Sequence, residues 1–435
     1  MKTSRQIVLE LLTKMDKNGS YSNIILDNTF SREKLDSREK GFATALFYGV
    51  LERKMTLDYI IRYYSSMEFD KLSTEVVQLL RMGIYQLLYM NSVPQSAAVN
   101  ETVLLAPKSA KGFVNAILRN FLRDGLKIDY KTLEGIGKLS IEYSCPKWLI
   151  KKWIAQFGDD GAEKILQSTF GRPPLFAKVN TLKCTAAELI EALKKEGVEA
   201  KKNELLDDCV EIGRVQGVEF TNAYRRGLFH IQDISSQLCC KIARPMFNET
   251  VLDMCAAPGG KSFTMAEMMN NRGKLYSYDL YEGKVSFLRE GAKRLGIDIL
   301  TASANDATVF NEEIPQADKV LCDVVCSGLG VVRRKPEIKY KPMKELEEIP
   351  PIQKKILETC SRYVKLGGTL IYSTCTINTD ENERIIEEFL QNNSDFAPII
   401  VPLNIAGVPE SHMRTFLPYI TGGDGFFAAT LRRIK

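Results

Sequence analysis

From residue 250 onward, the chain alternates short apolar runs with longer amphipathic runs. The short runs have the length of buried strands, and the longer runs carry apolar residues at helical spacing. Strands that are apolar on both faces must be covered by helices on both sides, which requires a largely parallel sheet. We therefore predict a doubly wound α/β domain over residues 246–435. The tail, MRTFLPYITGGDGFFAATLRR, reads as strand, turn and strand, so the sheet is expected to carry an antiparallel edge.

The front of the chain has a different pattern, with no alternating strand signal. Its length of 435 residues exceeds what one core usually serves, so separate domains are expected. We predict an all-α domain over residues 1–125, a linker over 126–144, and a small α+β subdomain over 145–245, where helical and strand-like runs mix. The helices of the first domain are expected at 4–15, 38–65, 73–90, 97–108 and 111–125.

Composition restricts the class of protein. The chain has no apolar run long enough to cross a bilayer and no secretory signal at its start, so a cytoplasmic protein without a membrane partner is expected. Its ten cysteines show no paired spacing, which favours reduced thiols. With only two histidines, His230 and His412, and no CxxC pair, no metal site is expected. The shortage of histidine also assigns proton transfer to carboxylates, thiols or water.

Charge is distributed unevenly between the two halves. Residues 1–144 hold 20 Lys and Arg against 16 Asp and Glu, whereas residues 251–435 hold 23 against 24. A mildly basic front domain indicates a nucleic-acid partner, although an ordinary solvated surface produces such an excess about as often.

A glycine-rich turn follows the first strand of the α/β domain, in the segment VLDMCAAPGGKS (251–262). Glycines let a ligand approach the backbone, and the following helix offers free N–H groups, although a tight turn alone explains them equally well. Asp279 ends the next strand, where a carboxylate can accept hydrogen bonds from ribose hydroxyls. This pattern leaves both nicotinamide and adenosyl cofactors open. Asp306 follows the third strand, placed either to meet an adenine edge or to cap a turn.

Two thiols and a carboxylate follow the fourth and fifth strands. Asp323 and Cys326 come after one strand, and Cys375 ends the next. Because the carboxyl ends of parallel strands meet at one edge, these groups should face a single crevice together with the cofactor loop. A thiolate there can add to an electrophilic carbon, the covalent strategy that a weakly reactive aromatic ring requires. The cysteines inside apolar runs are instead predicted to be small buried hydrophobes: Cys239, Cys240, Cys322 and Cys360.

A basic segment, VVRRKPEIKYKP (331–342), follows the Cys326 turn. Arg333, Arg334 and Lys335 suit the phosphates of a polynucleotide, the alternative being a solvated basic loop.

Several segments carry a family resemblance. VLDMCAAPGGKS, SYDL, NDAT, DVVCSGLGVVRRKPEIKY and GGTLIYSTCTINTDENE resemble, in that order, the signature segments of the RNA cytosine-5 methyltransferases that use S-adenosylmethionine. FHIQDISSQLCCKIARP (229–245) looks like the family's lead-in segment, residues 145–228 look like its small RNA-binding subdomain, and the helical front resembles the NusB-like RNA-binding domain. The combination is similar to bacterial enzymes that act on small-subunit ribosomal RNA.

The resemblance implies a Rossmann-like class I methyltransferase domain and a set of site residues. Cys375 would be the nucleophile, Cys326 would help release the product, and Asp323 would bond the base. The remaining implied contacts are with S-adenosylmethionine: Cys255, Ala256, Ala257, Pro258, Gly259, Gly260, Lys261, Asp279, Asp306 and Asp323. A monomer acting on ribosomal RNA of the small subunit is expected.

One residue departs from the family pattern. The family usually has proline before the first cysteine, whereas this chain has Val325. Without the fixed φ of proline, the loop that presents Cys326 is expected to be looser or differently aimed.

Two other classes of protein share part of the pattern. A dehydrogenase would share the glycine-rich turn and Asp279 but gives no reason for two thiols, and a NusB-like binding factor would explain residues 1–125 only.

Overall fold

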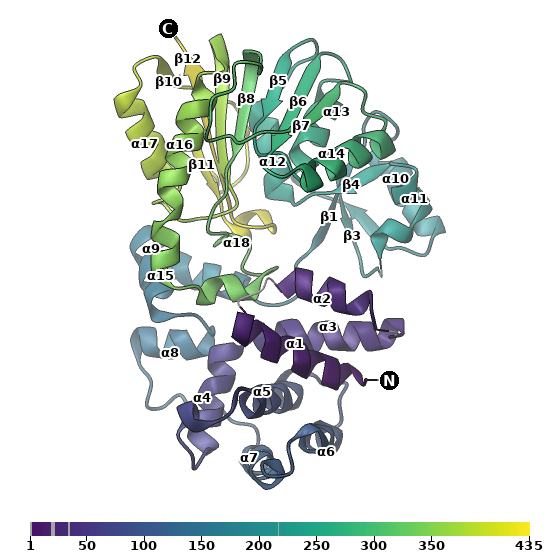
Figure 1. Cartoon of the computed structure of the whole chain (residues 1–435), viewed down its shortest axis with the longest axis vertical. Coiled ribbons are helices and arrows are strands. Elements are labelled where there is room, and N and C mark those ends of the chain that lie inside the picture. Colours follow the sequence, from purple (N-terminus) through teal and green to yellow (C-terminus); the bar gives the residue numbers. More distant parts are fainter. Residues whose placement is uncertain (1, 19–21, 34, 216) are drawn as a thin grey trace. The chain divides into compact units, whose positions relative to one another are not determined.

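The structure is a computed structural model that describes residues 2–18, 22–33, 35–215 and 217–435. It divides into two compact units (Figure 1). One unit comprises Met1–Gly171 together with Val332–Lys341, and the other comprises Arg172–Val331 together with Pro342–Lys435. These units do not test the domain boundaries expected from the sequence, which stay predictions.

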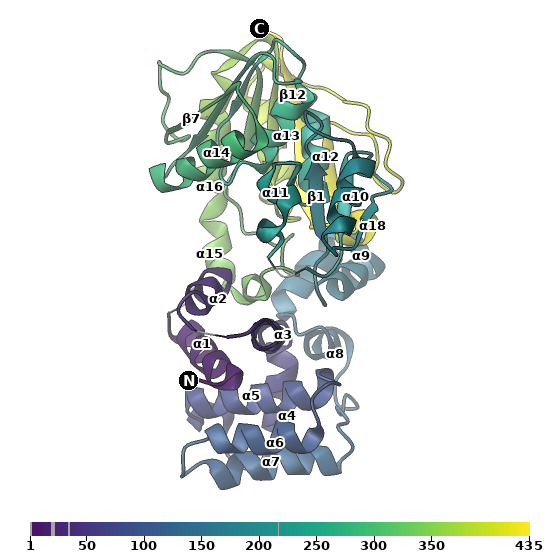
Figure 2. The ribbon, with the colours of Figure 1, turned by 90° about the vertical axis from the view of Figure 1, so that its right-hand side faces the viewer.

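The first unit is helical (Figure 2). Its core is formed by the apolar faces of its helices. Polar caps set several helix starts; for example, the Oγ of Ser73 accepts from the backbone N–H of Val76. The α-helices are α1 (Ser4–Asn18), α2 (Ser22–Phe30), α3 (Ser37–Glu52), α4 (Lys54–Tyr64), α5 (Thr74–Tyr89), α6 (Gln95–Leu105), α7 (Lys111–Arg123), α8 (Gly135–Glu142) and α9 (Lys147–Ser168).

The structure differs from the expected helices at three places. The run expected at 38–65 is two helices, because Arg53 leaves helical geometry at φ −105° and ψ 14°. The expected linker contains α8, and α2 was not predicted from the sequence. Both helices are short, and a short helix is fixed more by tertiary packing than by its own periodicity.

A segment distant in sequence, Val332–Lys341, packs within the helical unit. It contains the 3₁₀ helix η3 (Pro336–Tyr340). Glu337 accepts hydrogen bonds from the backbone N–H and the hydroxyl of Ser22, at 3.0 and 2.8 Å. Lys339 is fully buried, and its ammonium donates to the carbonyl oxygen of Glu52 at 2.8 Å. The segment is therefore anchored by buried polar contacts as well as by apolar packing.

The second unit begins with a small antiparallel sheet in the order β2–β3–β1–β4. Its strands are β1 (Leu175–Val179), β2 (Ala200–Lys202), β3 (Cys209–Ile212) and β4 (Phe229–Ile231). Two helices accompany them, α10 (Ala186–Lys195) and α11 (Asn222–Arg225). Leu189 and Leu193 of α10 pack with Val179, Val210 and other strand residues to form a separate core. The mixed pattern expected for this region therefore corresponds to an α+β subdomain.

The large sheet has the order β10–β12–β9–β8–β5–β6–β7, with β11 paired to β12. The strands β7, β6, β5, β8 and β9 are parallel, and β10, β11 and β12 add the predicted antiparallel edge. The strands are β5 (Thr250–Asp253), β6 (Lys274–Asp279), β7 (Leu300–Ala304), β8 (Ala317–Asp323), β9 (Val364–Thr374), β10 (Phe396–Pro398), β11 (Met413–Phe416) and β12 (Phe426–Arg433).

Helices cover both faces of this sheet (Figure 1). Successive strand residues point to opposite faces, so Leu321 packs with one set of helices and Cys322 with the other. One face holds α12 (Ile234–Ala243), α13 (Gly260–Met268) and α14 (Glu282–Leu295). The other holds α16 (Ile349–Ser361) and α17 (Glu383–Asn392). The short helices α15 (Met343–Glu347) and α18 (Pro418–Thr421) complete the unit. This is the Rossmann-like doubly wound architecture predicted from the sequence.

None of the helices in the described part of the chain is long and apolar enough to cross a membrane.

Candidate active site

The strand order reverses between β5 and β8, which lie side by side in the middle of the sheet. The chain goes outward from β5 to β6 and β7, then returns to β8 and continues to β9. Ligands of doubly wound sheets bind beyond the carboxyl ends of the strands at such a switch point. The glycine-rich turn leaves β5, Asp323 ends β8, and Cys375 follows β9. The sequence-predicted groups therefore come from adjacent strands.

The glycine-rich turn joins β5 directly to α13. Gly259 is the residue before the helix and has φ +112°, in the region that L side chains rarely adopt. A Cβ at this position would lie 2.4 Å from the ring of Phe263. Gly259 is therefore required both by the backbone conformation and by the packing of the helix on the turn. The turn and the first turn of α13 contain all seven predicted cofactor residues from Cys255 to Lys261.

Asp279 lies beside this turn at the end of β6. Its Oδ2 accepts a hydrogen bond from the backbone N–H of Ala257 at 3.2 Å, and the residue is only 7% exposed. Asn305, at the end of β7, is bonded through its backbone N–H to the carbonyl oxygen of Asp279 at 3.0 Å. The amide nitrogen of the Asn305 side chain is buried without a hydrogen-bond partner in the described structure. A buried donor of this kind calls for an external acceptor, which the adenine nitrogens of S-adenosylmethionine would supply. The residues present therefore fit an adenosyl cofactor.

Asp306 has a local role in the structure. Its Oδ1 accepts hydrogen bonds from the hydroxyl and the backbone N–H of Thr308, at 2.7 and 2.9 Å. These bonds, first from the hydroxyl and then from the backbone, lower the pKa of the carboxyl group. The turn-capping alternative is thus present, and a cofactor contact of Asp306 stays a prediction.

Asp323 connects the cofactor turn with the fifth strand. Its Oδ2 accepts from the ammonium of Lys261 at 2.7 Å, and its Oδ1 accepts from the hydroxyl of Ser373 at 2.7 Å. Burial alone would lower the pKa of Lys261, but the Asp323 carboxylate outweighs it and the pKa is raised. Lys261 is therefore a fixed cation in the site. Each carboxylate oxygen of Asp323 keeps a lone pair for a substrate.

Cys326 and Cys375 face each other with their sulfur atoms 3.3 Å apart, and both are free thiols of intermediate burial. The hydrogen bond with Cys375, followed by burial, raises the pKa of Cys326 well above its ordinary value. Cys326 therefore keeps its proton and can donate it toward the sulfur of Cys375. The four cysteines predicted to be buried hydrophobes are all fully buried: Cys239, Cys240, Cys322 and Cys360.

Three polar residues near the thiols were missed by the sequence analysis. Ser373 holds Asp323, while Glu381 and Gln353 bond the loop that carries Cys326. Glu381 and Gln353 are fully buried. Polar residues in otherwise amphipathic or loop segments look like surface positions in a sequence, so their burial only becomes visible in the fold. The segment TCTINTDENE did contain a signal, because a run of Asx and Thr residues after a strand favours side-chain to backbone bonding.

The basic residues Arg333, Arg334 and Lys335 belong to Val332–Lys341, which is part of the helical unit. All three are partly buried, and the Nε of Arg333 lies 3.4 Å from the carbonyl oxygen of Gly171 as a donor. Their contact with RNA stays a prediction.

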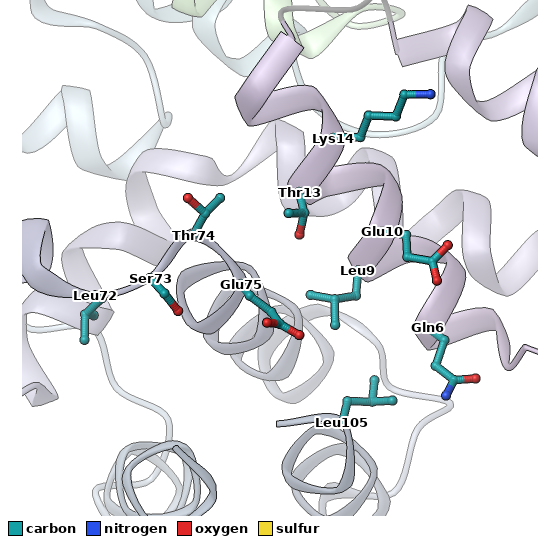
Figure 3. A pocket seen from close by; sticks show the side chains of 10 residues that line it. All are labelled: Gln6, Leu9, Glu10, Thr13, Lys14, Leu72, Ser73, Thr74, Glu75 and Leu105. Carbon is teal, nitrogen blue, oxygen red and sulfur yellow. The ribbon is translucent and has the colours of Figure 1, made fainter. Parts of the chain in front are cut away.

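A hollow of about 930 Å³ lies in the helical unit between α1 and the start of α5 (Figure 3). Its lining includes the carboxylates of Glu10 and Glu75 and the ammonium of Lys14. It contains none of the predicted site residues. Among the residues that the structure describes, no group of three or more His, Cys, Asp or Glu side chains could hold a metal ion.

Comparison with known proteins defines the family. Residues 241–432 match the family described as 16S rRNA methyltransferase RsmB/F. Residues 2–123 match the NusB family, and residues 145–219 match the ferredoxin-like domain of RsmF/B-like methyltransferases. A probable ribosomal RNA small subunit methyltransferase B of Bacillus subtilis (strain 168) is 38% identical, over 99% of each chain. The chain belongs to the RsmB family of ribosomal RNA methyltransferases.

Other relatives agree with this family along most of the chain. Ribosomal RNA small subunit methyltransferase B of Klebsiella pneumoniae (MGH 78578) is 30% identical, over 96% of this chain and 95% of its own. The solved structure of PH0851 is 25% identical, with a TM-score of 0.81 over 100% of this chain and 99% of its own. NSun6 from Pyrococcus horikoshii, solved with SFG, shares the fold at 21% identity, with a TM-score of 0.60 over 67% of this chain and 98% of its own. An RsmB-family enzyme has S-adenosylmethionine as its cofactor, and the dehydrogenase alternative is therefore wrong. The alternative of a NusB-like binding factor accounts only for the helical front.

Proposed function

We propose that this RsmB-family enzyme methylates C5 of a cytosine in 16S ribosomal RNA through a covalent adduct between Cys375 and C6. The observation that carries the proposal is the pair of free thiols, 3.3 Å apart, beside Asp323 at the switch point of the sheet. A single thiol would suffice for addition to the ring. A second thiol in contact with the first is needed only if the reaction also includes a proton transfer at the same site. The enzyme is expected to act as a cytoplasmic monomer without a metal.

The cofactor would be held by the turn from Cys255 to Lys261, by Asp279 and by the edge formed by Asn305 and Asp306. Asp279 would accept the ribose hydroxyls, and the unpaired amide of Asn305 would donate to the adenine. When bound, S-adenosylmethionine supplies an electrophilic methyl group.

Cys375 acts first on the base. C5 of cytosine is a poor nucleophile. The Cys375 thiolate raises the nucleophilicity of C5 by forming a bond to C6. The C5–C6 π electrons then become available at C5, which makes that carbon enamine-like. Cys326 is suited to favour this step, because a protonated thiol at hydrogen-bond distance lets the negative charge reside on Cys375.

Asp323 acts on the other side of the ring. Its carboxylate, fixed by Lys261 and Ser373, would accept a hydrogen bond from the amino group beside N3 and, once N3 of the adduct has taken up a proton from solvent, from that N3–H, which stabilises the adduct. Two fixed contacts leave the carboxylate no rotational freedom, so it is oriented before the base arrives.

Release needs a base. Once C5 carries a methyl group, its original hydrogen must leave as a proton so that the C5–C6 double bond re-forms and the Cys375–C6 bond breaks. Cys326 takes this proton after its own thiol proton has passed to solvent, or a water that Cys326 positions takes it, and Cys375 leaves as a thiolate. The target base must also leave its stack, at a cost of a few kcal/mol that a single-stranded loop base largely avoids.

The proposal is tested with unmodified small-subunit rRNA transcribed in vitro, the purified enzyme and methyl-labelled S-adenosylmethionine. Nuclease digestion and mass spectrometry should find the label in 5-methylcytidine. Labelled 5-methylcytidine in tRNA but not in rRNA would show that the substrate is another RNA. Label in a different nucleoside would overturn the C5 assignment.

A further inference from the structure

The loop that presents Cys326, residues 324–331, lacks the proline expected before the cysteine, yet it is held by several hydrogen bonds. Here it is called the Cys326 loop. The side chain of Val325 is 56% exposed and contributes little packing. Its carbonyl oxygen, however, accepts a hydrogen bond from the Nε2 of Gln353 at 2.8 Å. The backbone N–H of Ser327 donates to the Oε2 of Glu381 at 2.7 Å. The residues on both sides of Cys326 are therefore fixed by buried side chains.

Glu381 is the centre of these contacts. It is fully buried, and its Oε2 also accepts from the Nε2 of Gln353 at 3.2 Å. Its Oε1 accepts from the Nδ2 of Asn378 at 2.8 Å. A buried carboxylate is costly unless its oxygens receive hydrogen bonds, and here three N–H donors supply them. Of these three donors, Ser327 belongs to the Cys326 loop, and Gln353 also bonds that loop through the carbonyl oxygen of Val325.

The same residue is tied to the segment that follows Cys375. Its backbone carbonyl accepts from the hydroxyl of Tyr372 on β9 at 2.6 Å, and its backbone N–H donates to the carbonyl of Asn378 at 3.0 Å. Ser327 meets this segment as well, because its hydroxyl lies 2.9 Å from that of Thr376. Glu381 thus connects the two chain segments that carry the thiols.

We infer that Glu381 is a positioning residue that holds Cys326 against Cys375. The inference rests on the proposed function, since it assumes that Cys326 acts in product release. The negative charge of Glu381 also contributes, after the contact with Cys375 and burial, to raising the pKa of Cys326.

The test is Glu381→Gln in the full-length chain, which removes the charge and keeps the size. Glu383→Gln is the matched control, because Glu383 lies two residues further along the chain at the start of α17, is partly buried, and bonds Thr415 instead of the Cys326 loop. Methyl transfer in a single turnover should change by no more than about twofold, because Cys375 and Asp323 are untouched. Steady-state turnover should fall by about tenfold, as expected for the loss of a charge-assisted hydrogen bond that matters only for release. A protein–RNA species should accumulate on a denaturing gel.

A second readout follows the thiol itself. In a Cys375→Ser background, the rate of Cys326 alkylation by iodoacetamide is measured against pH. Glu381→Gln should move its midpoint to lower pH, because a nearby negative charge no longer opposes ionisation. A residue with a merely structural role would leave the midpoint where it was. If Glu381→Gln does not fold, as shown by lost binding of S-adenosylhomocysteine, Gln353→Leu removes the anchor of Val325 and should give the same adduct to a smaller extent.

Cys326→Ala is run in parallel. If Cys326→Ala itself turns over normally, the release step of the proposed function is wrong, whatever Glu381 does. If Cys326→Ala traps the adduct whereas Glu381→Gln and Gln353→Leu behave like Glu383→Gln, only the positioning role of Glu381 is overturned.

Discussion

The sulfur atoms of Cys326 and Cys375 lie 3.3 Å apart although the residues are 49 positions apart in the chain. The distance is that of a thiol hydrogen bond and is longer than the ~2.05 Å of a disulfide. The pair differs from the chain's fully buried cysteines in being partly accessible from outside. Two thiols in this arrangement can have opposite roles in one reaction, one in attack on the base and the other in product release.

Substitutions that remove one or the other thiol should therefore have opposite effects on the adduct. We expect Cys375→Ala to reduce methylation to background and to form no adduct, because nothing then activates C5. Cys326→Ala should still permit attack and methyl transfer but slow release, so a protein–RNA species resistant to a denaturing gel should appear when the cofactor is present. Cys360→Ala is the control, since Cys360 is a fully buried cysteine distinct from this pair. Normal turnover of Cys375→Ala would refute the chemistry, whereas a missing Cys326→Ala adduct would leave the nucleophile assignment intact.

Asp279 should matter for the cofactor alone. Asp279→Ala removes the carboxylate that would accept the ribose hydroxyls, so the affinity for S-adenosylhomocysteine should fall by about tenfold or more. Calorimetric titration measures this affinity, and a filter-binding assay should show little change for RNA. Asp298→Ala is a suitable control, because Asp298 is an exposed aspartate bonded to Asn271 near the start of β7. An unchanged affinity for Asp279→Ala would remove this residue from the site.

Arg334 and Lys335 should contribute to RNA binding through phosphates. We expect the double change to Gln to weaken rRNA binding for all sequences and to reduce the slope of log affinity against log salt by about 1 to 2. Binding of S-adenosylhomocysteine should stay as in the unchanged protein. Binding curves at several salt concentrations test this directly. The same affinity and slope in both proteins would assign the basic segment to an ordinary solvated surface.

Lys339 should make the stability of the helical unit depend on pH. Burial lowers its pKa to about 8 from 10.5, so the folded unit resists protonation of this amine. Between about pH 8 and 10.5 the unfolded chain binds the proton and the folded chain does not, so this contribution to stability rises with pH and is smallest below pH 8. Lys339→Met removes the free-energy cost of burying a charged amine. The substitution should therefore raise the unfolding free energy at pH 7 by up to about 3 kcal/mol, with little gain at pH 10.5.

Tryptophan fluorescence is a selective measurement for this prediction. The chain has two tryptophans, Trp148 and Trp153, and both lie on α9 in the helical unit. Urea unfolding followed at this signal therefore reports the unit that contains Lys339. The carbonyl of Glu52 keeps a donor in the variant, because the hydroxyl of Tyr340 lies 3.3 Å from it. A gain of the same size at both pH values would show that Lys339 is buried without a lowered pKa.

The sequence by itself determined the layers of the α/β domain and the order of its chemistry. Strand and helix periodicities differ, and apolar runs bounded by turn residues gave strands β5 to β9 in their correct sequence positions. Because parallel strands end at one edge, the positions of Asp279, Asp323 and Cys375 at strand ends predicted which residues share a crevice. Local rules of this kind need no knowledge of distant contacts.

Only the tertiary structure decided how the Cys326 loop is held. From the sequence, Val325 in place of proline indicated a looser loop, because a local rule considers only the backbone of that residue. In the fold, Gln353 and Glu381 bond the residues on either side of Cys326. These partners are 28 and 54 positions from the residues that they hold, and their burial depends on how α16 and the segment after β9 pack. Hydrogen bonds between distant side chains leave no period in a sequence, so the restraint on the Cys326 loop becomes visible only when the chain is folded.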